Sequence, residues 1–301
     1  MKLSFIGLGH MGFAMAERLL DAGFDLTVYN RTKEKAEKLI EKGAAWAISP
    51  KEASHNCDFL LSMVSDDHSL DAIMNGPDGC LDTLPKGATH ISLSTISPSF
   101  ATHLEKVHLS RGQGFVSSPV FGRPTAVKSG TLRILCAGNN ENVHRVLPVL
   151  EALGSKVYLL GENPSSANLV KLAGNFMIAS ALETLGEAFS LARKASVAPG
   201  LFLEIINDSL FRSPLYENYG HIMAEKSYDK AGFSMDLGLK DINLVLESAN
   251  ELRVPLPVAN LVKDSLLSGL AKGRERLDWA AILLSSYDRA GIQDSQADTK
   301  K

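Results

Sequence analysis

The length, composition and charge of the chain indicate a globular protein with room for two domains. Of its 301 residues, 45% are hydrophobic and 22% are charged, which is ordinary for a soluble protein with sizeable cores. The formal net charge of −3 argues against a general nucleic-acid binder, which usually carries a basic excess. We therefore expect that the protein does not bind nucleic acid.

Cysteine usage and the start of the sequence favour a cytoplasmic location. The three cysteines are an odd number and lack the spacing of metal ligands, which fits a reducing compartment. The sequence opens in a strand-forming segment with no visible signal peptide, and the uncharged stretch 172–182 is too short to cross a bilayer. We expect no membrane contact, and a frayed polar end at residues 293–301.

The first half of the chain alternates short apolar strands with amphipathic helices. Strands are predicted at residues 2–6, 25–29, 44–47, 59–64, 89–93, 114–118, 132–137 and 157–160. Helices are predicted between them at residues 34–42, 67–74, 99–110 and 142–153. This alternation is typical of α/β domains with a doubly wound, mainly parallel sheet, in which ligands bind at the carboxyl ends of the strands.

A glycine-rich turn follows the first predicted strand and opens a helix. Gly7 allows the tight turn, Gly9 lets the backbone approach a pyrophosphate, and Gly12 lets the helix pack closely on the sheet. The start of the helix also offers free N–H groups to phosphates. We therefore predict a Rossmann-type dinucleotide site whose turn also includes Leu8, His10 and Met11.

The tip of the second strand indicates which dinucleotide binds. A carboxylate here would bind the ribose of NAD, but the sequence has Asn30, Arg31 and Thr32. A guanidinium can hold a 2′-phosphate through paired hydrogen bonds, so NADP(H) is predicted in preference to NAD(H). The alternative is that Arg31 is a solvated turn residue.

Further candidate residues lie where other predicted strands end. Met63 and Val64 end the strand 59–64, and we expect them to contact the cofactor. Ser94 and Thr95 follow the next strand, where their hydroxyls suit a substrate carboxylate or the nicotinamide ribose. Ser97 is better explained as a helix cap that precedes proline at the first helical position.

The segment after the strand 114–118 is a second candidate for substrate binding. It includes Phe121, Gly122 and Arg123. Gly122 permits close approach of the backbone, and Arg123 could bind a carboxylate through two hydrogen bonds. A solvated loop arginine is the alternative.

After residue 161 the pattern becomes helical. One long helix is predicted at 165–194, with apolar residues on more than one face, so we expect it to be buried on several faces. Further helices are predicted at 199–210, 215–226, 234–252, 257–269 and 279–290. The chain is thus predicted to contain a nucleotide-binding domain, residues 1–162, and an all-helical domain, residues 163–301, for substrate binding and oligomerisation.

Lys171 and Asn175 lie four residues apart in the long helix, and hence on one face. A lysine in this apolar segment could exchange a proton with a carbonyl oxygen, and Asn175 could orient the substrate or the ammonium group. Alternatively, Lys171 extends to solvent and Asn175 is a surface residue. The residues alone leave both interpretations open.

The remaining polar residues give weaker signals. Lys240 could reach the cofactor from the helical domain, or form a surface pair with Asp236. The eight histidines show no ligand spacing, so no metal site is predicted, and His103 and His108 are expected on a helix surface.

Taken together, these motifs resemble the β-hydroxyacid dehydrogenase family over nearly the whole chain. The resemblance rests on the glycine turn with Met15-Ala16, on Ser94-Thr95-Ile96-Ser97-Pro98, on Pro119-Val120-x-Gly122, and on Lys171, Asn175 and Lys240-Asp241. It implies that Lys171 is the catalytic acid/base with Asn175 beside it, that Thr95 and Lys240 contact the cofactor, and that residues from Ser94 to Arg123 surround the substrate. It also implies a homodimer or homotetramer.

The resemblance is strongest to the NADPH-dependent glyoxylate/succinic semialdehyde reductases. We expect reduction of a small aldehyde or keto acid, or oxidation of the matching 3-hydroxyacid. Two departures concern the substrate pocket: Phe121-Gly122-Arg123 replaces the usual Ser-Gly-Gly, and no glycines precede Lys171 closely. The alternatives are an imine reductase, against which Lys171 counts, and a non-catalytic NADP(H)-binding protein.

Overall fold

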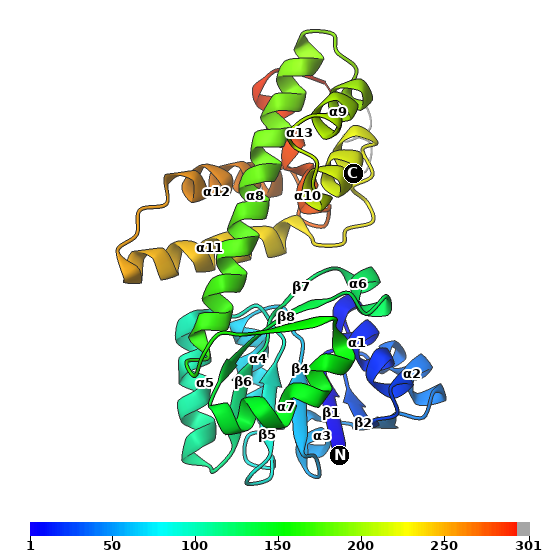
Figure 1. The fold of residues 1–301 in the computed structure, drawn as a ribbon, viewed down its shortest axis with the longest axis vertical. Coiled ribbons are helices and arrows are strands. Elements are labelled where there is room, and N and C mark those ends of the chain that lie inside the picture. Colours follow the sequence, from blue (N-terminus) through cyan, green and yellow to red (C-terminus); the bar gives the residue numbers. More distant parts are fainter. Residues whose placement is uncertain (294–301) are drawn as a thin grey trace. The chain divides into compact units, whose positions relative to one another are not determined.

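The computed structural model describes residues 1–293, which divide into two compact units (Figure 1). The first unit is Met1–Lys171 and the second begins at Leu172. Helix α8 (Ser165–Lys194) therefore contributes its first turns to one unit and the remainder to the other. The frayed end that we expect lies, apart from Gln293, outside the described residues. The predicted domain boundary after residue 162 stays a prediction.

The first unit is built on a mainly parallel sheet, as predicted, and this sheet has nine strands. The strand order is β3-β2-β1-β4-β5-β6-β8-β7, with β9 beside β8. Strands β1 to β6 run parallel, and β8 pairs antiparallel with β6 and β7 but parallel with β9. The strands are β1 (Lys2–Ile6), β2 (Asp25–Tyr29), β3 (Ala45–Trp46), β4 (Phe59–Ser62), β5 (Thr89–Ser92), β6 (Gly114–Ser117), β7 (Val120–Phe121), β8 (Arg133–Gly138) and β9 (Lys156–Leu159).

Helices cover both faces of this sheet because its central strands are apolar on both sides. Phe5 and Leu61 pack with α1 (His10–Asp21), α2 (Glu37–Glu41) and α7 (Asn140–Leu153). Ile6 and Leu60 point the other way and pack with α3 (Pro50–Ser54), α4 (Asp67–Asn75) and α5 (Pro98–Ser110). The alternation of neighbouring residues between two cores is what a doubly wound sheet requires.

Short elements account for the main differences from the sequence prediction. Strand β7 and helix α6 (Pro124–Lys128) lie where we predicted a loop. The predicted helix 34–42 is a 3₁₀ turn, η1 (Lys33–Lys35), followed by α2. Strands of two residues and helices of three to five residues are too short to show a strand or helical period.

The second unit is all-helical, as predicted. It contains most of α8 together with α9 (Pro199–Asp208), α10 (Pro214–Ala224), α11 (Met235–Leu252), α12 (Pro257–Leu270), η2 (Trp279–Ala281) and α13 (Ile282–Arg289). Proline begins α9, α10 and α12, where its missing N–H costs no helical hydrogen bond. Leu182, Phe189 and Trp279 are central residues of its core.

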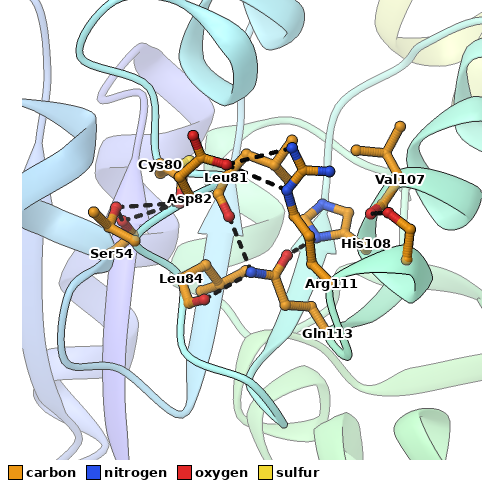
Figure 2. Close-up of polar contacts among 11 residues, drawn as sticks. Ser54, Cys80, Leu81, Asp82, Leu84, Val107, His108, Arg111 and Gln113 are labelled. Carbon is orange, nitrogen blue, oxygen red and sulfur yellow. Dashed lines mark hydrogen bonds and ion pairs between the residues drawn. The ribbon is translucent and has the colours of Figure 1, made fainter.

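His108 is fully buried, so its expected position on a helix surface was wrong. Figure 2 shows its ring beside Gln113, whose amide donates to the carbonyls of Leu81 at 3.0 Å and Leu84 at 2.7 Å. The Gln113 oxygen therefore faces His108 Nδ1, 2.9 Å away, and can only accept.

This assignment fixes the remaining protons in the cluster. With Nδ1–H as donor, a neutral His108 accepts at Nε2 from His90 Nδ1, at 3.0 Å. His90 in turn accepts at Nε2 from the Ser62 hydroxyl, at 2.8 Å. Burial lowers the pKa of His108 to about 4, and burial together with the neighbouring His108 lowers the pKa of His90 well below its usual range. The chain of hydrogen bonds is complete only when both rings are neutral.

The three cysteines are free and buried, and all belong to the first unit. Burial raises the pKa of Cys57 and Cys136 to about 11 and that of Cys80 to about 12. Their thiols are therefore protonated at neutral pH.

Candidate functional site

The glycine turn forms a cradle that only glycine allows. Gly7 has φ +97°, and a Cβ there would lie 2.3 Å from the Met63 carbonyl oxygen. A Cβ on Gly12 would lie 1.9 Å from the Gly7 oxygen, so α1 packs directly on the turn. Over Gly9, by contrast, no atom of the described chain apart from its neighbours in the sequence lies within 4 Å of a Cβ position.

Helix α1 begins at this open position. Gly9 is its N-cap, and within residues 1–293 no side chain caps the helix and no acidic residue lies in its first turn. The N–H groups of the first turn and the positive end of the helix dipole therefore remain available to phosphate oxygens. The cradle fits the pyrophosphate of a dinucleotide.

Asn30 connects the tip of β2 to the glycine turn. Its Oδ1 accepts from the Leu8 N–H at 3.0 Å, and its Nδ2 donates to the Thr32 carbonyl at 2.9 Å. Arg31 and Thr32 are exposed beyond it. Asn30 thus orders the tip, and the two exposed residues are accessible to a ligand.

The ends of β1, β4, β5 and β6 lie together, as the sequence predicted for a parallel sheet. The Met63 N–H donates to the Ile6 carbonyl at 2.9 Å, and the Val64 N–H donates to the Ser94 hydroxyl oxygen at 2.8 Å. Ser94 is fully buried, so its hydroxyl fixes one loop against another, whereas Thr95 is partly exposed.

Ser97 is the cap of α5 that the sequence favoured. Its Oγ accepts from the Phe100 N–H at 3.1 Å. The Asp67 carboxylate accepts from the Ser97 N–H at 2.9 Å and from its hydroxyl at 2.5 Å. Sequence reasoning missed Asp67, which holds the loop that includes Thr95; its only signal is an acidic residue in the first turn of α4.

The predicted substrate loop runs from β7 into α6. Gly122 has φ +145°, a backbone conformation that favours glycine, and a Cβ there would lie 2.7 Å from Leu132 Cδ1. Arg123 is partly buried at the N-cap of α6. The Phe121 ring lies against Lys171, whose Nζ is 4.4 Å from the ring centroid.

Lys171 lies on the part of α8 that packs in the first unit. One turn earlier, Ala167 is buried against β8, and the fully buried Asn168 donates to Ser117 Oγ at 2.5 Å. These contacts place the start of α8 beside the ends of β6 and β8, and Lys171 follows from them on the same helix.

In the second unit, one buried carboxylate contacts two predicted site residues. Asp241, with 1% of its side chain exposed, accepts from Asn175 Nδ2 at 2.5 Å and pairs with Lys240 Nζ at 2.7 Å. The partner that the structure shows for Lys240 is thus its neighbour Asp241. Asp241 was not among the predicted site residues, and only its place beside Lys240 in the sequence could have indicated it.

Among residues 1–293, no group of three or more His, Cys, Asp or Glu side chains is placed to hold a metal ion. Within the same range, no helix is long and apolar enough to cross a membrane.

Comparisons with known proteins match both units. A family model described as the NAD binding domain of 6-phosphogluconate dehydrogenase matches residues 2–161. A second model, described as NAD-binding of NADP-dependent 3-hydroxyisobutyrate dehydrogenase, matches residues 165–285.

Similar proteins cover nearly the whole chain. An uncharacterised oxidoreductase of Bacillus subtilis, YfjR, is 44% identical over 94% of this chain and 99% of its own length. Glyoxylate/succinic semialdehyde reductase 1 of Arabidopsis thaliana is 30% identical over 94% and 97%. The crystal structure of 3-hydroxyisobutyrate dehydrogenase from Salmonella typhimurium has the same fold, with a TM-score of 0.87 at 24% identity over 94% and 99%. The chain therefore belongs to the β-hydroxyacid dehydrogenase family of NAD(P)-binding oxidoreductases that act on CH–OH groups.

Proposed function

We propose that the protein is an NADPH-dependent reductase of a small aldehyde or keto acid, and that it oxidises the matching 3-hydroxyacid in reverse. The observation that carries this proposal is the position of Lys171. It is an ammonium group at the start of α8, in the same compact unit as the open glycine cradle. Carbonyl reduction needs a hydride donor and an acid/base group, and this unit contains both a dinucleotide cradle and Lys171.

NADP(H) is supported by the tip of β2. Asn30 is engaged with the backbone, so recognition of the adenosine ribose falls to the exposed Arg31 and Thr32. Neither residue carries the negative charge that would repel a 2′-phosphate. The description of the second matching family model as NADP-dependent agrees with this preference.

The substrate class follows from the relatives and from the cationic loop. The name of the Arabidopsis relative indicates glyoxylate and succinic semialdehyde, which are small carboxylates with an aldehyde group. Arg123, with Ser94 or Thr95, would bind the carboxylate, and Phe121 and Gly122 would border the same pocket. Ser94 is fully buried and Thr95 is partly exposed, so Thr95 is the more accessible of the two hydroxyls.

In the proposed mechanism, the cofactor supplies the hydride when it is bound. The N–H groups at the start of α1 and the glycine turn, including His10 and Met11, would hold its pyrophosphate. Met63, Val64, Thr95 and Lys240 would contact the rest of it. Lys171 Nζ donates a proton to the carbonyl oxygen and Asn175 orients the reacting groups. Most of the rate would come from positioning and from a positive charge at the developing alkoxide.

Replacement of Lys171 tests this mechanism. Lys171→Ala should lower kcat by about 10²-fold or more, because the proton donor is lost, with little change in NADPH affinity. The assay follows NADPH absorbance with glyoxylate, succinic semialdehyde, tartronate semialdehyde and methylmalonate semialdehyde. Lys106→Ala, at an exposed position of α5, is the matched control. Near wild-type turnover by Lys171→Ala would contradict the proposed role.

We also propose that the protein forms a homodimer or homotetramer and that it is located in the cytoplasm. Several apolar side chains on the surface of the second unit are at least half exposed, among them Met177, Leu191, Leu252 and Val258. Scattered exposed apolar residues are normal, but several on α8, α11 and α12 offer area for a second copy. Sedimentation velocity would show a single-chain mass if this is wrong.

A further inference from the structure

The contact between Phe121 and Lys171 gives Phe121 a role that does not involve proton transfer by Phe121 itself. Lys171 Nζ lies 4.4 Å from the centroid of the Phe121 ring, within the range of a cation–π interaction. We propose that Phe121 is a positioning residue, which holds the Lys171 ammonium at the place from which it delivers its proton. The catalytic part of this inference rests on the proposed function, whereas the contact itself does not.

The Phe121 ring packs against buried residues. Phe121 packs on a small buried cluster formed by Leu135, Ala137 and Ala167. Its backbone is fixed in register with Arg133 on β8. The ring therefore cannot move freely, and it presents a fixed surface to Lys171.

Helix α8 brings the ammonium to the same place. Ala167 and Lys171 are four residues apart, which puts both on one face of the helix. Ala167 packs with the cluster that supports Phe121, and Lys171 contacts the ring one turn further along. The ring thus bridges two successive turns of the helix.

The ring acts on the ammonium in two ways. Its negative π-face attracts a cation but has no comparable attraction for a neutral amine, so it favours the protonated form. It also restricts a long side chain that otherwise samples many rotamers. An aliphatic side chain of similar size would fill the space but supply no such attraction.

The first test measures the reactivity of Lys171 without any substrate. Wild type, Phe121→Leu and Phe121→Tyr are treated with acetic anhydride at neutral pH, and acetylation of Lys171 is followed by peptide mass spectrometry. Because only the free amine reacts, Phe121→Leu should be acetylated about fivefold faster, whereas Phe121→Tyr should stay within about twofold of wild type. Lys106 in the same samples is the internal control.

The second test separates positioning from a general structural effect. With an active substrate, Phe121→Leu should lower kcat about fivefold or more while the KM for NADPH stays constant, and Phe121→Tyr should restore kcat. Phe121→Met replaces the leucine variant if circular dichroism shows that the latter does not fold.

Two outcomes would overturn the proposal. These are equal acetylation of Lys171 in all forms, and acceleration in the tyrosine as well as the leucine variant. If no form reduces any carbonyl acid, the proposed function fails. The acetylation rates still show whether the Phe121 ring affects the reactivity of the Lys171 amine.

Discussion

Acidification is expected to destabilise the first unit through its buried histidine pair. His108 has a pKa of about 4 in the folded protein and 6.5 as its ordinary value. The folded state therefore binds fewer protons than the unfolded state between these values. Protonation of His108 therefore costs no stability above about pH 6.5, and it lowers the free energy of unfolding as the pH falls toward 4.

The magnitude follows from these two values. At pH 5 an unfolded His108 is almost fully protonated, but only about a tenth of the folded form is, which corresponds to a loss of about 2 kcal/mol. His90, whose pKa is lowered in the same direction, adds to this loss. Protonation would also place two N–H donors against each other in the hydrogen-bonded chain.

The two tryptophans allow the first unit to be observed by itself. Trp46 lies in the first unit and Trp279 in the second, so a Trp279→Phe background leaves fluorescence that reports the first unit alone. Urea unfolding is measured at pH 7 and pH 5 in this background, with and without His108→Gln. Glutamine can donate to Gln113 and accept from His90, but it does not titrate.

The difference between the two proteins isolates His108. The protein with His108 should lose about 2 kcal/mol more between pH 7 and pH 5 than the glutamine variant. Titrating groups that do not interact with His108 are common to both and cancel, whereas the part of the His90 pKa shift that is caused by His108 belongs to the difference. An equal decline in the two proteins would refute the reasoning.

Two further substitutions test the predicted binding residues. Arg31→Ala should raise the KM for NADPH about tenfold or more and leave the KM for NADH nearly unchanged, because only NADPH has the 2′-phosphate; an equal change in both KM values in steady-state kinetics would contradict the assignment. Asp241→Asn keeps an oxygen for Asn175 but removes the charge opposite Lys240, which should destabilise the second unit by about 1–3 kcal/mol. Urea unfolding in a Trp46→Phe background measures this, and unchanged stability would show that the pair is not stabilising.

The elements with a strong apolar pattern could be predicted from the sequence. Strands β1 and β2 and helix α8 have the predicted limits, because an alternating or helical apolar pattern and a glycine turn act over neighbouring residues. Helix α6 has five residues and begins at Pro124, so it shows no period. The cofactor cradle could also be predicted, because each glycine of the turn is explained by the local backbone.

Contacts between distant residues could not be read in this way. Asp241 meets Asn175 across 66 residues, and nothing in a single sequence pairs them. His108 was misplaced for another reason. Ala101, Leu104 and His108 form the buried stripe of α5, whereas a polar residue type by itself predicts exposure. Its hydrogen-bond partners, which make that burial possible, lie on other elements.

The buried thiols offer a means of following the motion of the first unit. With pKa values of about 11 to 12, the cysteines hold almost no nucleophilic thiolate while the unit is closed, and alkylating reagents cannot reach them. Any modification at neutral pH must then report transient opening. Cys80, between α4 and β5, and Cys136, on β8, sample separate parts of the sheet unit without an introduced label.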